Sequence, residues 1–507
     1  KEFLATLTGL SGVAIRRPVF TTMIMLGLVV LGAFSFRGLP IDQYPDVDLP
    51  IVTVQTVYPG ASPESIEREV TRRLEEAFPD TLAVIGVNSP KYPAEQDPDS
   101  LASAIARHDI RHPVVHDPDL RIWRDYGIQA WPTLVFIDPH GRILGHLPGE
   151  PEADKLLAGI GQMLRRWRGA TPRPLPLRIP EPTEGRFRFP AKIKPVVAGC
   201  GGGKQWAIAD SGHHQVVLCD DDGRELRRFG RGRPGFLDLP GEGCAFSSPQ
   251  GLCSDGERIY VADTGNHAVR RIDLATGAVT TLAGTGKRGS LLAAAECAHD
   301  ACLAAPWDVE CWGNRLFFAN AGTHQLGCLD LAGGTVWALA GSGEEDLVDG
   351  AAAEANLAQP TGLALDRTEG LLYFVDSETS SVRVLTACED GRVETLVGAG
   401  LFECGKRNGD FAQARMQHCR GIAWRTGGLV IADTYNGLVR VLDLASRQVS
   451  ALGGDDCAWS NGIRLAGGEP AGVAADGDTR LLVCDTNHHR IVELTCQDGA
   501  AARVWAS

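Results

Sequence analysis

Apolar runs alternate with short polar turns throughout the second half of the chain, in a pattern that occurs six times. The copies are WAIADSGHHQVV (from 206), IYVADTGNHAVRRID (259), LFFANAGTHQLGCLD (316), LYFVDSETSSVRVL (372), LVIADTYNGLVRVLD (429) and LLVCDTNHHRIVEL (481). Each copy has the composition of two strands joined by a tight turn. Six copies at a period of 52 to 57 residues predict a β-propeller of six blades.

A second phrase precedes each copy and predicts the inner strand of its blade. The phrases are FPAKI (189), PQGL (249), PWDV (306), PTGL (360), CRGI (419) and PAGV (470). Between one blade and the next phrase the chain makes a long excursion, for example EEDLVDGAAAEANLAQP (344–360). We expect these excursions to gather on one face of the propeller.

Each copy carries an acid or its amide at the turn, and histidines recur beside it. The turn residues are Asp210, Asp263, Asn320, Asp376, Asp433 and Asp485. A carboxylate here is expected to accept backbone N–H groups, a structural role rather than a catalytic one. The candidates for a partner-binding rim are His213, His214, Asn266, His267, His324, Asn436, His488 and His489. Because these histidines come from different blades, without the close spacing of ligands on one helix, we predict no metal site.

An α/β pattern lies ahead of the propeller. A buried strand (82–87), a helix (99–109), a hairpin (133–147) and a closing helix (151–169) follow one another, the order found in the second half of a thioredoxin fold. Trp131, Pro132 and Thr133 stand where that fold places a cis-proline, although an ordinary loop proline is the alternative. Lys91 and Tyr92 fall in a loop, where such residues are usually solvated.

Two segments of this α/β region carry a family resemblance. FPDTLAVIGVNSPKYPAE (78–95) and HPVVHDPDLRIWRDYGIQAWPTLVFIDPHGRILG (112–145) resemble the thioredoxin-like domain of the family of NHL-repeat-containing protein 2 and its bacterial relatives. The proline-rich linker (169–185) and the six repeats, which resemble NHL repeats, follow in the same order as in that family. The resemblance therefore covers residues 78–507. It implies a redox-linked or scaffolding protein with a partner in the cleft between the two domains.

The N-terminal region has a different character. Residues 18–36 carry no charge and lie between Arg17 and Arg37, which predicts a transmembrane helix, with a signal peptide as the rival. Residues 1–77 resemble the start of resistance-nodulation-division efflux transporters, but no second spanning stretch follows, so transport is not expected. A strand (51–57) and a helix capped by Ser62 then take the place of the first thioredoxin strand and helix, which suggests a fusion near residues 74–78.

These patterns predict a multidomain chain. The predicted parts are an N-terminal segment (1–49) with a transmembrane helix, a truncated thioredoxin-like α/β domain (50–168), a linker (169–185) and an all-β six-bladed NHL propeller (186–507). The chain is expected to be anchored in the inner membrane if residues 18–36 are used, and cytoplasmic otherwise. The many unpaired cysteines expected here suit a reducing compartment such as the cytosol. This conflicts with the membrane anchor, which would place most of the chain outside the cytoplasm.

Cysteine positions and net charge narrow the function. All 14 cysteines lie at or beyond Cys200 and no CxxC pair occurs, so the α/β domain lacks a dithiol and we predict no catalytic residue and no cofactor. A net charge of -14 disfavours nucleic acid. We therefore predict a binding platform for a protein or peptide at the propeller face or the interdomain cleft. A thiol-disulfide oxidoreductase and an efflux-transporter component are the alternatives.

Overall fold

The computed structural model describes eleven stretches of the chain. They are residues 17–37, 71–79, 81–149, 153–165, 185–196, 203–292, 296–386, 391–453, 463–465, 467–495 and 501–507. The chain divides into two compact units, Lys1–Gln55 and Thr56–Ser507, which are considered separately. The predicted strand at 51–57, the predicted helix after Ser62 and residues 169–184 of the linker lie outside the described residues.

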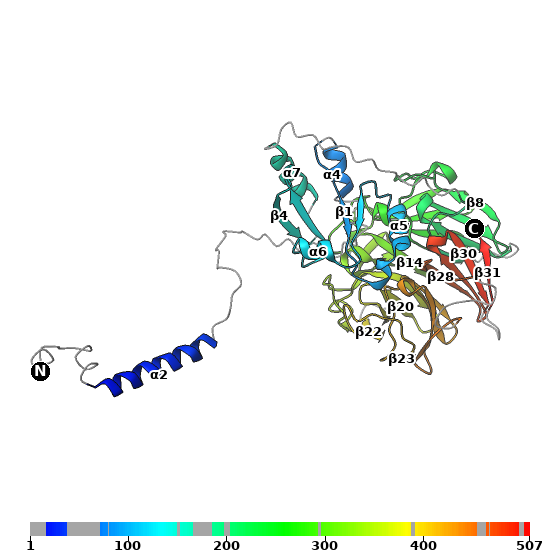
Figure 1. Cartoon of the computed structure of the whole chain (residues 1–507). Coiled ribbons are helices and arrows are strands. Elements are labelled where there is room, and N and C mark those ends of the chain that lie inside the picture. Colours follow the sequence, from blue (N-terminus) through cyan, green and yellow to red (C-terminus); the bar gives the residue numbers. More distant parts are fainter. Residues whose placement is uncertain are drawn as a thin grey trace, which may run out of the picture. The chain divides into compact units, whose positions relative to one another are not determined.

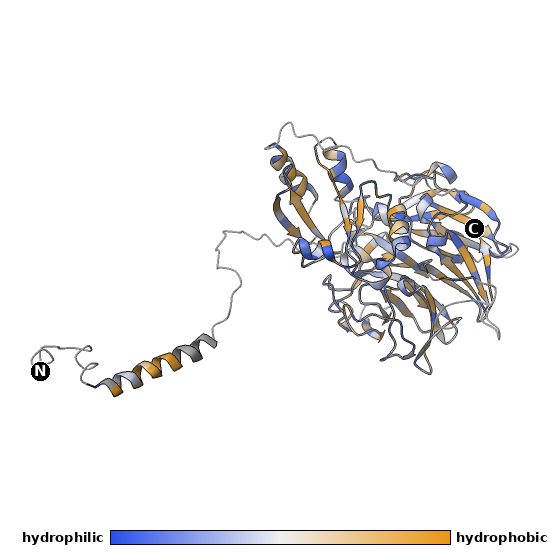
Figure 2. Cartoon of the chain, in the orientation of Figure 1, coloured by the Kyte–Doolittle hydropathy of each residue, from blue (hydrophilic) through white to orange (hydrophobic). Residues whose placement is uncertain are grey.

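The described part of the first unit is one helix, α2 (Pro18–Arg37), labelled in Figure 1. Figure 2 shows apolar residues along its described part. Across the described stretches, however, no helix has both the length and the apolar character needed to cross a membrane. The transmembrane helix predicted for residues 18–36 is therefore not supported.

The second unit begins with a small α/β region. Its helices and strands are α4 (Arg72–Ala77), β1 (Gly86–Asn88), η2 (Pro93–Gln96), α5 (Pro98–Arg107), β2 (Val114–His116), α6 (Arg121–Asp125), β3 (Thr133–Ile137), β4 (Ile143–Pro148) and α7 (Ala153–Leu164). Strands β1 and β2 pair in parallel, and β3 and β4 form an antiparallel hairpin. Within the described residues these are two separate two-stranded sheets. Leu74, Leu156 and Ile160 form the core between α4 and α7.

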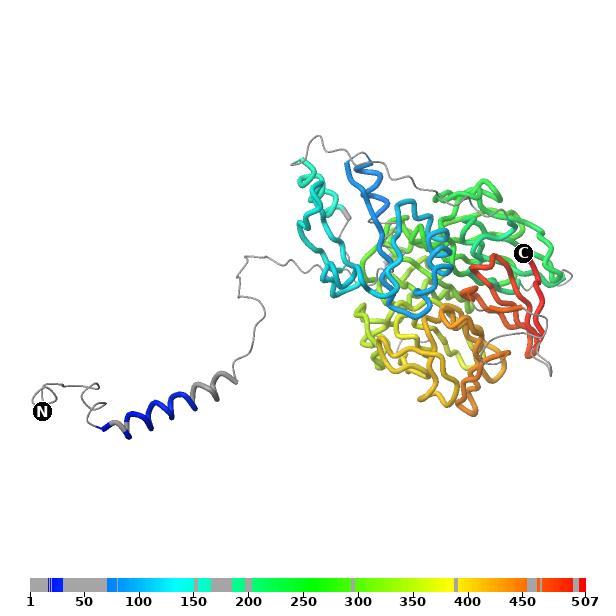
Figure 3. Tube along the Cα trace, in the orientation of Figure 1, coloured from blue at the N-terminus to red at the C-terminus, as the bar shows by residue number. Residues whose placement is uncertain are grey.

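The rest of the unit is a ring of six antiparallel sheets, so the prediction of six blades is confirmed (Figures 1 and 3). Blade 1 consists of β5 (Pro190–Val196), β6 (Gln205–Asp210), β7 (Gln215–Asp220) and β8 (Glu225–Phe229). Blade 2 consists of β9 (Gly251–Ser254), β10 (Arg258–Asp263), β11 (Ala268–Asp273) and β12 (Val279–Ala283). Blade 3 consists of β14 (Pro306–Trp312), β15 (Arg315–Asn320), β16 (Gln325–Asp330) and β17 (Thr335–Ala340), with β13 (Glu296–Cys297) at the outer edge.

Blades 4 to 6 follow the same order from inner to outer strand. Blade 4 consists of β19 (Pro360–Asp366), β20 (Leu371–Asp376), β21 (Ser381–Thr386) and β22 (Arg392–Val397), with β18 (Gly350–Ala351) at the outer edge. Blade 5 consists of β24 (Gly421–Arg425), β25 (Gly428–Asp433), β26 (Leu438–Asp443) and β27 (Gln448–Ala451), with β23 (Gly409–Asp410) at the outer edge. Blade 6 consists of β28 (Pro470–Asp476), β29 (Arg480–Asp485), β30 (Arg490–Thr495) and β31 (Ala501–Ala506).

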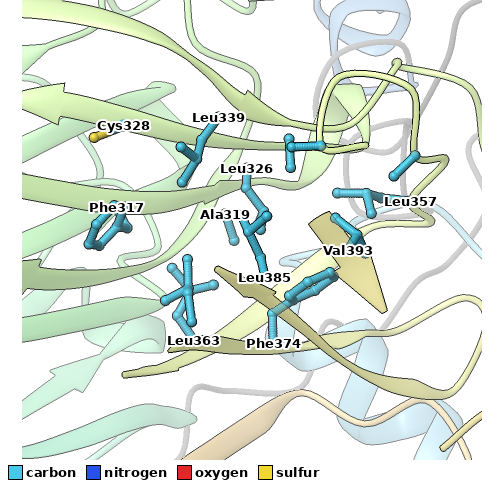
Figure 4. Packing of buried hydrophobic residues seen from close by; sticks show 14 of the residues in the cluster. Phe317, Ala319, Leu326, Cys328, Leu339, Leu357, Leu363, Phe374, Leu385 and Val393 are labelled. Carbon is cyan, nitrogen blue, oxygen red and sulfur yellow. The ribbon is translucent and has the colours of Figure 1, made fainter. Parts of the chain in front are cut away.

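Apolar side chains from neighbouring blades make the core of the propeller. Figure 4 shows the layer between blades 3 and 4, where Phe317 and Leu326 meet Leu363, Phe374 and Leu385. All of these side chains are buried. Burying one such side chain contributes roughly 1.5–3 kcal/mol to the free energy of folding. Because a single blade cannot bury both faces of its sheet alone, this stabilisation is gained only when neighbouring blades pack and the ring forms as a whole.

Ion pairs cross the centre of the ring. Lys192 of β5 lies with its Nζ 2.5 Å from Oδ2 of Asp308 on β14, and Lys194 pairs with Glu310 on the same two strands. The Asp308 carboxylate also accepts the backbone N–H of Leu363 in blade 4 at 2.9 Å. These bonds join the inner strands of blades 1, 3 and 4, and they satisfy charges that burial would otherwise destabilise.

Candidate binding face of the propeller

The repeated acid fixes the start of its own blade. Asp263 accepts the backbone N–H of Ser247 at 2.7 Å, and Asn320 accepts that of Ala304 at 2.9 Å. Asp210, Asp376 and Asp433 do the same with Arg188, Ala358 and Gln417. The bond holds the turn against the segment that leads into the inner strand, which is a structural role. We call the face that carries these turns the top face.

A buried arginine completes this arrangement in several blades. Arg270 is fully buried and donates to Asp263 at 2.7 Å and to Asp238 in the preceding excursion at 2.5 Å. Arg383 binds Asp376 and Asp349 in the same way. Burial raises the pKa of Asp263 to about 6 although the Arg270 charge opposes the rise. In these two blades the arginine ties the preceding excursion to the turn, which places both excursions on the top face.

Four of the predicted rim histidines instead join one blade to the next. They adopt a left-handed backbone conformation, and the Nδ1 atom of each accepts a backbone N–H from the following blade. The donors are Ser248 for His214, Ala305 for His267, Gln359 for His324 and Phe189 for His489, all at 3.0 to 3.1 Å. In blade 4 the Ser380 hydroxyl takes this role, and in blade 5 Gly437 has no side chain to offer.

The other four predicted rim residues bind the acid of their own turn. His213 lies 2.8 Å from Asp210, Asn266 2.8 Å from Asp263, Asn436 2.9 Å from Asp433, and His488 2.9 Å from Asp485. The predicted partner-binding rim thus consists of residues that already serve the propeller itself. Their polarity is used within and between blades, because an unpaired polar group in a buried turn is costly.

The inter-blade histidines should make the propeller sensitive to acid. Burial lowers the pKa of His324 to about 4, and burial likewise lowers the pKa of His214 to about 4. Unfolded histidine titrates near 6.5, so below that pH the unfolded chain binds protons that the folded chain does not. We expect the free energy of unfolding to keep its full value above pH 6.5 and to decrease as the pH falls toward 4. The decrease should be on the order of 3 kcal/mol for each histidine.

Urea unfolding at pH 7.5 and at pH 5 checks this expectation. A His324→Ser variant, which copies Ser380 of blade 4, should lose less stability between the two pH values than the parent chain. The same pH dependence in both proteins would contradict the assignment to His324.

One turn position differs between the two halves of the ring. Two residues after the repeated acid, blades 1 to 3 have glycine, at Gly212, Gly265 and Gly322. The glycine is required there, because a Cβ on Gly265 would lie 2.5 Å from the carbonyl oxygen of Ser247. Blades 4 to 6 carry side chains instead, and these are Glu378, Tyr435 and Asn487.

Two of those side chains, Glu378 and Tyr435, meet a loop of the α/β region. Lys91 Nζ lies 2.8 Å from Oε2 of Glu378, and the Tyr92 hydroxyl donates to the same oxygen at 3.3 Å. The Tyr92 ring makes an edge contact with Tyr435, with centroids 5.5 Å apart, and lies 5.8 Å from the ring of His418. Tyr92 is only 5% exposed, and this burial, with the Glu378 charge, raises the pKa of its hydroxyl. The expectation of a solvated loop is wrong.

A second contact lies at blade 6. Arg107, the last residue of α5, binds Glu469 at 2.8 Å, and Glu469 is 8% exposed. Glu469 begins blade 6, at the junction where Gly437 of blade 5 has no side chain to accept its N–H. We define the docking site as the propeller residues that take these contacts: Glu378, His418, Tyr435 and Glu469.

The predicted cis-proline site lies near this loop. The Trp131–Pro132 peptide bond is cis, and Thr133 donates its hydroxyl to the carbonyl of Ala130 at 2.7 Å. Trp131 donates its indole N–H to the carbonyl of Ser89 at 2.8 Å and packs on Trp123 with ring centroids 4.1 Å apart. Its side chain is nevertheless 47% exposed. An apolar edge thus remains open close to the docked loop.

Two family models match the chain. The model described as the NHL repeat matches residues 246–272, in blade 2, and the model described as the AcrB/AcrD/AcrF family matches residues 10–90. NHL repeat-containing protein 2 of Gallus gallus is 34% identical over 456 residues. The chain is a homologue of NHL repeat-containing protein 2. The alignment covers 81% of this chain and 61% of the relative, so the chain spans less than two thirds of that protein.

Other relatives extend this homology. The Arabidopsis thaliana protein SUPPRESSOR OF QUENCHING 1, chloroplastic, is 32% identical over 456 residues, covering 85% of this chain and 43% of its own length. A solved structure of a protein of unknown function from Bacteroides thetaiotaomicron aligns at a TM-score of 0.42 with 18% identity, over 62% of this chain and 70% of that one. A similarity at that level supports no functional argument.

Proposed function

We propose that the chain is a non-catalytic binding platform. In this proposal the propeller holds a thioredoxin-like α/β region at the docking site, and that region receives a protein or peptide segment along its open edge at Trp131 and Pro132. The proposal is supported by the order of elements in the α/β region and by the homology with NHL repeat-containing protein 2.

A single contrast in burial carries the proposal. Lys91 and Tyr92 are held by Glu378 on the propeller, whereas Trp131, bound to Ser89 of the same loop, stays open to solvent. A large aromatic side chain that is positioned by a hydrogen bond and still exposed is typical of a binding surface, because it can bury apolar area without being ordered first.

An unfolded chain without thiols provides a direct probe. We expect the alkylated insulin B chain, labelled with fluorescein, to bind the full-length protein and to bind a Trp131→Ala variant at least tenfold more weakly, a loss of about 1.4 kcal/mol. The matched control is Trp312→Ala, since Trp312 is also an exposed tryptophan, at 38%, but lies on the propeller. Equal affinity of the two variants, or no binding by the parent, would refute the proposed edge.

The alternative function is thiol-disulfide exchange, which the thioredoxin-like order of elements in the α/β region favours. This chemistry needs a thiolate near the proline, and the cysteines of this chain all lie at or beyond Cys200. Insulin reduction in dithiothreitol separates the two functions. The binding platform predicts the rate of buffer alone, and a faster rate would favour the oxidoreductase.

A further inference from the structure

One part of the top face is free of the α/β region. The described contacts of that region fall on blades 4 and 6, on His418 and Tyr435 of blade 5 and Phe402 in the excursion before it, and on Arg188 at the start of blade 1. All of these contacts lie away from blades 2 and 3. The excursions that border blade 2 are therefore available to another partner.

Each of these excursions exposes apolar side chains. Phe236 and Leu239 lie between β8 and β9 and are 38% and 49% exposed, while Leu291 lies between β12 and β13 and is 49% exposed. The Phe236 ring covers Gly286, where an added Cβ would lie 3.0 Å from it. The two excursions therefore touch at Phe236 and Gly286, and Leu291 lies further along the second excursion.

The same surface is basic in a chain of net charge -14. Arg231, Arg233 and Lys287 are exposed, and no carboxylate lies at ion-pair distance from them among the described residues. The nearest acid of the first excursion, Asp238, is already held by Arg270 and Thr281. Glu242, also exposed, is the remaining acid of this excursion, so cations outnumber free carboxylates here.

We propose that this surface binds an acidic peptide segment that carries apolar side chains. The basic apolar patch is defined as Arg231, Arg233, Phe236, Leu239, Lys287 and Leu291. Charge complementarity selects the acidic segment, and the leucines supply apolar contact area. The patch has one aromatic ring, whereas single-stranded nucleic acid is held by several rings that stack on bases. The inference rests on the proposed function as a binding platform and adds a second partner site to it.

Fluorescence anisotropy on the full chain tests the patch. The probe is a fluorescein-labelled peptide in which Glu and Leu alternate. A labelled peptide in which Lys and Leu alternate is the control probe of opposite charge. We expect the acidic peptide alone to bind, more weakly at high salt. The double variant Arg231→Glu with Arg233→Glu should weaken binding at least tenfold, and Lys287→Glu should weaken it by a smaller factor.

The control carries the same change of charge elsewhere. Arg224→Glu with Arg392→Glu alters two exposed arginines at the opposite ends of the strands, and it should leave binding unchanged. Equal weakening by both double variants, no binding of the acidic peptide, or patch-dependent binding of polyuridine in its place would overturn the inference. Loss of acidic-peptide binding in Trp131→Ala alone would move the site to the proposed edge and leave the platform function intact.

Discussion

Replacing Arg270 by alanine is expected to destabilise the propeller by about 3–5 kcal/mol, the usual loss when one partner of a buried ion pair is removed. Arg270 and Asp263 are both fully buried, and Arg270 also holds Asp238 of the preceding excursion. The variant leaves the Asp263 carboxylate without its cation. Urea unfolding, followed by tryptophan fluorescence, measures the loss.

The sign of a pH effect gives this prediction a second readout. Burial already raises the pKa of Asp263 to about 6, and loss of Arg270 should raise it further. A carboxyl whose pKa is raised by folding favours the folded state when it is protonated. The loss of folding stability that its ionised form causes therefore grows as the pH rises through that pKa. The defect in Arg270→Ala should therefore be smaller at pH 5 than at pH 8.

An exposed pair in the same blade supplies the control. Arg258 and Asp255 are 40% and 31% exposed, so Arg258→Ala should change stability by less than about 1 kcal/mol. If Arg270→Ala also lost less than about 1 kcal/mol of folding stability, with no dependence on pH, the buried pair would not hold the excursion to its turn.

Removing the Tyr92 side chain is expected to release the α/β region from the propeller. Tyr92 is almost fully buried between Glu378 and Tyr435, and truncation of a buried aromatic side chain to alanine typically costs 3–5 kcal/mol. In calorimetry of the full chain, Tyr92→Ala should lower the unfolding temperature of the α/β region. The transition of the propeller should stay in place.

Tyr92→Phe is the matched control for this prediction. It keeps the ring against Tyr435 and loses only the hydroxyl, whose bond to Glu378 is long at 3.3 Å. We expect an effect of about 1 kcal/mol or less. Equal effects of the two variants, or a propeller transition that falls with them, would contradict docking through the ring.

The propeller could be predicted because its evidence is periodic. Six copies of one strand-turn-strand pattern fix the blades, and the repeated acid fixes the turn. The expected clustering of the excursions follows from the same periodicity, and the bonds of Arg270 and Arg383 to two excursions show how it is achieved.

The rim histidines show what a repeat pattern omits. His267 and His324 recur at equivalent turns, and the sequence alone does not reveal that each imidazole accepts an N–H from the next blade. That bond depends on the distance between blades, which no residue within one copy records. The replacement of His by Ser380 in blade 4 was the available signal, since a small hydrogen-bonding side chain suits a linking role.

The docking site was missed for a similar reason. Aligning the six copies would have shown Gly212, Gly265 and Gly322 in one half and larger side chains in the other, which is a departure from the repeat rather than part of it. Lys91 and Tyr92 lie nearly 300 residues before their partners. Contacts over such a separation leave no local pattern in a single sequence.

The propeller holds the α/β region through blades 4 to 6. Hydrogen exchange with mass spectrometry, on the parent chain and on Tyr92→Ala, measures whether this contact exists in solution. We expect faster exchange in the variant in the segments around Lys91, His418 and Tyr435, with no change around Gly265 of blade 2. Equal exchange of the parent and the variant in those three segments would show that the α/β region is not held there.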